Sequence, residues 1–279
     1  MFNFINPFYY YHKRDRIFPV LKTVPQRVWD LIRFEMAGHS VYLSKNEKEF
    51  AKLKNKHSGK RCFIIGNGPS LRIADLDRLN TEITFAANKI YLAFDKTKWR
   101  PTYYAVTDDL VAKQSYHEIS NLSGFTKFFP CHAKTLWGAP FKNATYFRYI
   151  YYQNRYPKPP RFGLNPLRKI YAGRTVLYAF IQIAIFMGIR EIYLLGVDFN
   201  FSEPSKKKGE ILISEGESNH FHPKYRQLGE KWAEPKLNQQ EKAFEEAGKA
   251  IEKMGGRIFN ATRGGKLEVF SRVNFNELF

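Results

Sequence analysis

The sequence predicts an α/β protein built on a mostly parallel sheet with helices on both faces. Short apolar segments alternate with helical ones from about residue 60 onward. One of them, residues 62–65, leads directly into the polar, glycine-flanked turn 66–70, and residues 175–187 are apolar on nearly every side. A helix without a polar face and strands without alternating polarity are typical of a parallel sheet covered on both faces. The expected architecture is therefore Rossmann-like.

The elements follow from local patterns. Residues 1–57 are expected to form a helical, basic and aromatic N-terminal extension, with helices over 24–37 and over 44–54, where Ser44 is a cap. Residues 58–279 are expected to form the α/β domain, in which a polar helix over 238–254 ends at the Gly255-Gly256 pair. Its strands are predicted at 61–65, 83–87, 103–106, 127–129, 191–195 and 257–259.

A net charge of +19 implies an anionic partner: nucleic acid, an anionic membrane surface, or a phosphorylated or acidic substrate. The Lys and Arg residues are spread along the chain without a nucleic-acid-binding motif, so no nucleic-acid partner is expected. The sequence contains no apolar run long enough to span a bilayer and does not begin like a secretory signal. Cys62 and Cys131 are expected to be buried thiols, which favours a cytoplasmic location.

The N-terminal segment combines aromatic and basic residues, notably in residues 8–16. This composition suits the surface of an anionic bilayer, and it equally suits packing onto the domain. Peripheral contact with the inner face of the membrane is therefore one expectation for this segment. A homo-oligomer is left open by the sequence.

Polar and acidic residues follow several predicted strands, and in an open parallel sheet ligands bind at the carboxyl ends of the strands. Gly66 and Gly68 are expected to take positive φ and to let a phosphate approach the main chain, with hydrogen bonds from Asn67 and Ser70. The turn completes neither a dinucleotide fingerprint nor a P-loop. Further residues at this edge are Asn88, Asp108, Asp109 and Asp198.

His220 and His222 lie in a loop after the strand that ends near Asp198. Either is a candidate general base, and the pair is alternatively a metal site or an exposed pair without a role. Asp108 and Asp109 are candidates to hold Mg²⁺ or Mn²⁺ against a diphosphate together with Asp198, or else to cap a helix.

Several charged residues and one long loop have two interpretations. Arg174, Arg263 and Lys266 are either phosphate or carboxylate ligands or solvated surface charges. Residues 149–173 are either a functional lid or a surface excursion.

Two motifs carry a resemblance to a known group. The run Gly66-Asn67-Gly68-Pro69-Ser70-Leu71 with Asn88, and the run from Gly188 to Phe199, resemble the family 42 bacterial sialyltransferases. The wider group with this GT-A-like fold variant includes flagellin-glycosylation proteins and archaeal 6-hydroxymethyl-7,8-dihydropterin pyrophosphokinases. Residues 218–225 and 264–270 are closer to the uncharacterised, pterin-kinase-like branch.

The resemblance implies roles for individual residues. It places Gly66, Asn67, Gly68 and Asn88 at the phosphate and ribose of a CMP donor, and it makes His220 or His222 the general base. Two positions depart from the sialyltransferase pattern. The Ser-Gly pair expected at the start of the apolar helix is Val176-Leu177, which leaves Thr175 as its polar N-terminal group, and an expected Asn is Asp108.

The first expectation is a glycosyltransferase of surface glycan synthesis that uses a CMP-activated sugar acid and requires no metal. An alternative is a Mg-ATP-dependent pyrophosphokinase acting on a hydroxymethylpterin-like alcohol. A third is a non-catalytic module that binds a nucleotide or a glycan. The acceptor would be a glycan in the first case and a small alcohol in the second.

Overall fold

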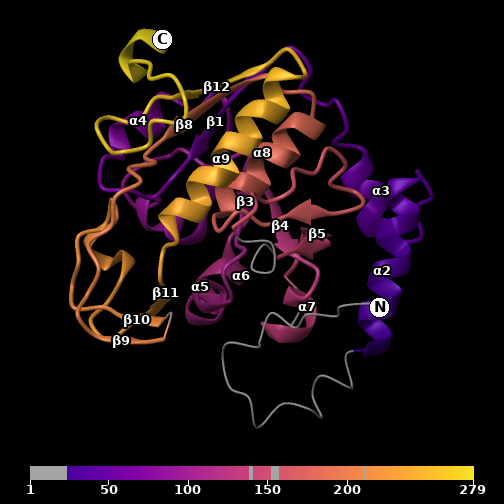
Figure 1. Ribbon diagram of the computed structural model, residues 1–279, viewed down its shortest axis with the longest axis horizontal. Helices are drawn as coiled ribbons and strands as arrows, with labels where there is room; N and C mark the ends of the chain where they lie inside the picture. Colours follow the sequence, from indigo (N-terminus) through magenta and orange to yellow (C-terminus); the bar gives the residue numbers. More distant parts are fainter. Residues whose placement is uncertain (1–23, 138–140, 152–156, 210) are drawn as a thin grey trace.

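The computed structural model describes residues 24–137, 141–151, 157–209 and 211–279. At its centre lies a seven-stranded sheet in which every neighbouring pair is parallel (Figure 1). The strand order is β12-β8-β1-β2-β3-β4-β5, which confirms the predicted fold class. The strands are β1 (Arg61–Ile65), β2 (Ile83–Ala87), β3 (Tyr103–Ala105), β4 (Thr126–Pro130), β5 (Ala144–Phe147), β8 (Glu191–Leu195) and β12 (Arg257–Asn260).

The strand order reverses beside β1. The chain runs outward from β1 to β5 on one side and returns through β8 to the other side, where Ile65 pairs with Leu195. Such a reversal leaves a crevice at the carboxyl ends of the two strands, because their following loops depart in opposite directions. The position of a ligand site is thereby set by topology.

Helices cover both faces of the sheet, as predicted. One face packs against α8 (Val176–Phe186) and α9 (Leu237–Glu252), which lie side by side in Figure 1. Every residue of α8 is buried, and Thr175 caps it by accepting a hydrogen bond from the Leu177 N–H at 3.3 Å. The opposite face is covered by α4 (Ile73–Asp77), the 3₁₀ helix η1 (Asn88–Ala93), α5 (Asp109–Gln114), α6 (Tyr116–Asn121) and α7 (Ala133–Leu136).

Several short elements were not predicted. A three-stranded antiparallel sheet follows β8, and a two-stranded parallel sheet lies within residues 149–173, which the sequence presents as a loop. β5 is also additional, and β3 ends at Ala105 rather than at 106. The short elements are β6 (Tyr149–Ile150), β7 (Ile170–Tyr171), β9 (Lys207–Lys208), β10 (Ile211–Ile213), β11 (Lys231–Ala233) and the 3₁₀ helices η2 (Pro223–Tyr225) and η3 (Phe275–Leu278).

Two N-terminal helices, α2 (Val24–Gly38) and α3 (Lys45–Ala51), lie beside β5 at the edge of the sheet (Figure 1). The Asn46 carboxamide pairs with the main chain of Tyr146 in β5, donating at 2.8 Å and accepting at 2.6 Å. The Asn46 side chain thus hydrogen-bonds to main-chain groups that an edge strand otherwise leaves unpaired. Residues 1–23 of the expected extension lie outside the described residues. Within those residues, no helix combines the length and the apolar character needed to cross a bilayer.

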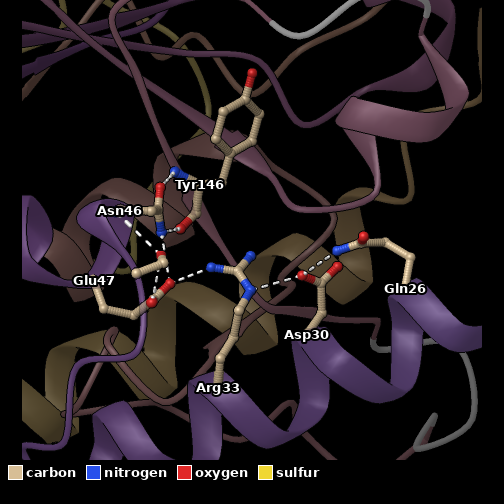
Figure 2. Close-up of polar contacts among 7 residues, drawn as sticks. Gln26, Asp30, Arg33, Asn46, Glu47 and Tyr146 are labelled. Atoms are coloured by element: carbon tan, nitrogen blue, oxygen red, sulfur yellow. Dashed lines mark hydrogen bonds and ion pairs between the residues drawn. The ribbon is translucent and has the colours of Figure 1, made fainter.

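A buried ionic network joins α2 to α3 (Figure 2). The Arg33 guanidinium lies between the carboxylates of Asp30 and Glu47, donating to Asp30 at 2.8 Å and forming a short contact with Glu47. All three side chains are nearly inaccessible to solvent. Removing one partner from such a network leaves a buried charge without compensation.

We therefore expect Arg33→Gln, which leaves the buried carboxylates of Asp30 and Glu47 without a cation, to lower the free energy of unfolding by about 3–5 kcal/mol, measured by urea denaturation. Lys52→Gln is the matched control, because Lys52 pairs with Glu49 at an exposed site. Exposed ion pairs contribute little, so this control should leave the urea midpoint unchanged. Equal midpoints for the two variants would show that Arg33 does not compensate the two buried carboxylates.

Candidate functional site

An open cavity of about 140 Å³ lies at the carboxyl ends of β1, β2 and β8. It brings together most of the side chains and turns that the sequence predicts for the site. Predicted residues that line it are Gly66, Asn67, Gly68, Asn88, Thr175, Asp198 and His220, and the others are Val176, Leu177, Gly196, Val197, Phe199, Asn200, Phe201, Asn219, Tyr225 and Gln240. The predicted residues Ser70, Asp108 and His222 are not among the lining residues.

The glycines of the β1 turn have a different role from the expected one. Neither Gly66 nor Gly68 has a positive φ, and both main-chain N–H groups are already bonded, at 2.8 Å to the Leu195 carbonyl and at 2.9 Å to the Gly196 carbonyl. A Cβ on Gly66 would overlap Gly196, and one on Gly68 would overlap the Asp198 carboxylate. The expectation that these two amides receive a phosphate is therefore wrong. The glycines allow the turns after β1 and β8 to pack backbone to backbone.

Two asparagines that line the cavity have buried side-chain oxygens without a hydrogen-bond partner among the described residues. Asn67 donates from its side chain to the Ala87 carbonyl at 3.1 Å, which leaves its buried Oδ1 without a partner among the described residues. Asn88 likewise has a buried, unpaired Oδ1. Unpaired buried oxygens in a native site call for a ligand donor or an ordered water. Both are suited to accept hydrogen bonds from hydroxyl or amino groups of a ligand.

The start of α8 faces the cavity through Thr175, Val176 and Leu177. The first turn of a helix carries unpaired N–H groups and a partial positive charge, which favours a bound anion. The position predicted for the phosphate thus moves from the β1 turn to the N-terminus of α8. Arg174, which precedes it, donates from Nε to Gln239 of α9 at 2.7 Å.

Backbone strain gathers around the same cavity. Three residues have φ values in the left-handed region, which residues other than glycine rarely adopt: 54° for Asn88, 61° for Arg174 and 53° for Phe199. They follow β2, precede α8 and follow β8, so all three border the carboxyl edge of the sheet. Strained residues of this kind concentrate at functional sites.

The histidine loop is tied to the β1 turn by a hydrogen bond from the Phe221 N–H to the Asn67 carbonyl at 3.0 Å. His220 stacks on Tyr225, with ring centroids 3.8 Å apart and an interplanar angle of 6°. Burial, followed by the positive charges of Arg226 and Lys89, lowers the pKa of His220 from 6.5 to about 3. The imidazole is therefore neutral near pH 7 and able to accept a proton, although it is a weak base without a ligand.

His222 is separated from this arrangement. Its Nδ1 accepts a hydrogen bond from the Lys224 N–H at 3.1 Å and caps η2. It lines a different hollow, together with Tyr91, Asp95 and Lys96. Of the two candidate bases, the structure brings only His220 to the cavity.

The three aspartates do not come together. The Asp198 carboxylate accepts from the Ser70 hydroxyl at 2.8 Å, whereas Asp108 caps α5 by accepting from the Leu110 N–H at 2.7 Å. Burial raises the pKa of Asp108. Asp109 accepts from Trp137 at 2.6 Å and lies 3.2 Å from His132. In the described part of the chain, no three His, Cys, Asp or Glu side chains are placed to share a metal ion.

The remaining predicted cations also lie elsewhere. The Arg263 guanidinium forms a bidentate ion pair with Asp75 and donates to Asn276. Lys266 donates its main-chain N–H to the Asp198 carbonyl at 2.7 Å, and its side chain is exposed. Tyr225, which stacks on His220, was missed, although its position in the histidine loop is the signal that could have found it.

The depressed pKa of His220 has a consequence for stability. Below about pH 6.5 the unfolded chain takes up a proton that the folded protein resists until about pH 3, so stability is lost as the pH falls through this range. As the pH is lowered from about 7 to about 4.5, we expect the free energy of unfolding to fall less in His220→Gln than in the wild type, as measured by urea titrations. His39→Gln, at an exposed site, should show the same dependence of unfolding free energy on pH as the wild type. The same result for His220→Gln would contradict a neutral, buried imidazole.

Comparison with known proteins supplies a family. No curated protein sequence matches the chain. A solved structure, the MAf glycosyltransferase from Magnetospirillum magneticum AMB-1, is similar at 15% identity and a TM-score of 0.47, covering 82% of this chain and 38% of that one. The chain thus spans well under half the length of that protein. The family model described as 6-hydroxymethylpterin diphosphokinase MptE-like matches residues 40–204, as the resemblance implied. Because this match covers more than half of the chain, the protein belongs to the MptE-like family.

Proposed function

We propose that the protein is a nucleotide-dependent transferase whose donor binds in the cavity with a phosphate at the N-terminus of α8. The observation that carries the proposal is the convergence of this helix terminus with the polar turns after β1, β2 and β8. Helix N-termini bind phosphates, and crevices at a reversal of strand order bind nucleotides. The unpaired oxygens of Asn67 and Asn88 supply acceptors for ribose or base donors.

The charge of the cavity favours a donor with one phosphate on its leaving group. Its described lining includes the carboxylate of Asp198 but neither Lys nor Arg. Transfer from ATP relies on metal ions and cationic side chains around the phosphates, whereas a CMP-activated sugar acid releases a single phosphate monoester. Glycosyl transfer from such a donor to a glycan hydroxyl therefore fits this lining best.

In this reaction the acceptor oxygen bonds to the anomeric carbon while the bond from that carbon to the phosphate oxygen breaks. The electron pair leaves with CMP, whose phosphate is stabilised by the amides at the start of α8. His220 takes the proton of the acceptor hydroxyl. A bound phosphate raises the proton affinity of a nearby imidazole, so donor binding would bring the pKa of His220 closer to the working pH.

A second candidate is diphosphate transfer from Mg-ATP to a hydroxymethylpterin-like alcohol, and the printed description of the family model favours it. The metal would have to be held by Asp108, Asp109 or Asp198. Asp108 already accepts from α5 and Asp109 from Trp137, so this chemistry requires those side chains to rearrange.

We expect CMP to raise the melting temperature without Mg²⁺, in thermal-shift measurements that compare CMP, CDP, ATP and AMP with and without the metal. Asn88→Gly keeps the positive φ available while it removes the carboxamide, so it should weaken the CMP shift. Stabilisation by Mg-ATP alone would favour the diphosphokinase. Tight binding without turnover of any donor would indicate a non-catalytic module, and no stabilisation by any nucleotide would contradict the proposal.

We further expect His220→Ala to lower turnover by ~100-fold or more while the nucleotide-induced shift of melting temperature is retained. His222→Ala is the matched control, because the His222 side chain lies outside the cavity, and it should retain most of the activity. Wild-type turnover in His220→Ala would remove His220 from the reaction.

A further inference from the structure

The helix α2 exposes large apolar side chains although two of its charged side chains are buried. Asp30 and Arg33 face inward beside Phe34 and Ala37, whereas large apolar side chains point to solvent. Four of them repeat along one side of the helix, namely Val28, Trp29, Ile32 and Met36, with exposed fractions of 40%, 46%, 47% and 39%. A surface helix normally buries its apolar stripe and exposes its charges. This arrangement leaves an exposed apolar surface, which is typical of an interaction site.

The inward charges are held by specific contacts, so they are not available to turn outward. Arg33 is enclosed by Asp30 and Glu47, as Figure 2 shows. Glu35, whose side chain is 32% exposed, also pairs with Arg148 at 2.7 Å and with Arg168 at 2.6 Å. The exposed apolar side chains, here called the outer face of α2, continue beyond the helix, and the full set is Val24, Val28, Trp29, Ile32, Met36, Val41 and Leu43.

A lysine-rich segment follows the outer face in the chain. α3 follows α2 directly and lies at the same edge of the molecule (Figure 1). Of the acidic side chains in residues 45–60, Glu47 is buried against Arg33 and Glu49 pairs with Lys52. Exposed lysines on α3 and in the turn after it are Lys45, Lys48, Lys52, Lys54, Lys56 and Lys60.

We propose that the outer face of α2 docks onto an anionic membrane surface, with its aliphatic and Trp side chains in the interface and the lysines near lipid headgroups. Interfacial helices combine such an apolar face with neighbouring cations, and each Lys or Arg near an anionic bilayer adds attraction. Trp29 suits the interface, because its ring is amphipathic.

Charge argues for lipid over a second copy of the chain. A symmetric dimer through the outer face would place the same surface of each subunit opposite itself, so the lysine-rich segments of two chains of net charge +19 would approach one another. An anionic surface instead attracts them. The first 23 residues precede Val24 in the sequence and contain Lys13, Arg14, Arg16 and Lys22, which add to the positive charge of the chain.

The test is co-sedimentation of the full chain with vesicles of phosphatidylcholine alone or mixed with phosphatidylglycerol, at about 0.1 M NaCl. The wild type should bind the mixed vesicles. Ile32→Glu and Trp29→Ser should each weaken this binding by about tenfold or more, because they remove apolar contact at exposed positions. Leu228→Glu is the matched control, since Leu228 is 79% exposed and distant in sequence from α2, and it should bind like the wild type.

Other outcomes overturn the proposal. These are failure of the wild type to bind mixed vesicles, equal binding by the wild type and both outer-face variants, or equal binding with and without phosphatidylglycerol. Sedimentation velocity tests the alternative that the outer face forms a dimer. A wild-type dimer that Ile32→Glu dissociates, without vesicle binding by the wild type, would assign the outer face to a second copy instead. None of these results depends on the reaction at the cavity.

Discussion

The close contact between the turns after β1 and β8 is the constraint on which the site depends. The N–H groups of Gly66 and Gly68 bond to carbonyls of the β8 turn, and Ser70 bonds to Asp198 just beyond it. This contact closes the floor of the crevice between the two strands. Since the N–H groups of Gly66 and Gly68 are bonded internally, the phosphate site that we propose is instead the positive end of α8. The same glycines shape the cavity by letting the two turns pack closely.

In the proposed reaction, the electrostatics of the histidine loop would connect donor binding to proton transfer. Arg226 and Lys89 help to keep His220 neutral, and neither is among the residues that line the cavity. Their charges are partly taken up by neighbours, since Lys89 forms an ion pair with Glu230 at 2.6 Å. A phosphate at α8 would oppose the remaining positive potential. The imidazole would then become a competent base only when a donor is present, which limits unproductive proton transfer.

Sequence patterns predicted the central strands and α8 because burial on every side leaves a continuous apolar signal. They missed β5 and the short antiparallel strands, which are brief and largely set by tertiary contacts. Local sequence also could not distinguish His220 from His222, because only the fold assigns one to the cavity and the other to a cap. The roles of Gly66 and Gly68 were mistaken for a similar reason: the sequence does not reveal which backbone passes against a glycine.

The periodicity of α2 did not reveal which side of the helix is buried. Helical spacing of Val28, Leu31, Ile32 and Phe34 predicts an apolar stripe, but it does not say which side meets the protein, and of the four only Phe34 is buried. Beside Phe34, the inward side carries the ionic network next to Asn46, whose carboxamide bonds to the edge strand β5. A well-packed apolar contact would often stabilise such an interface as well as or better than buried charges. Stability alone therefore gives little reason for the arrangement. The membrane contact proposed for the outer face would explain it, because a helix can present one exposed apolar stripe to only one side.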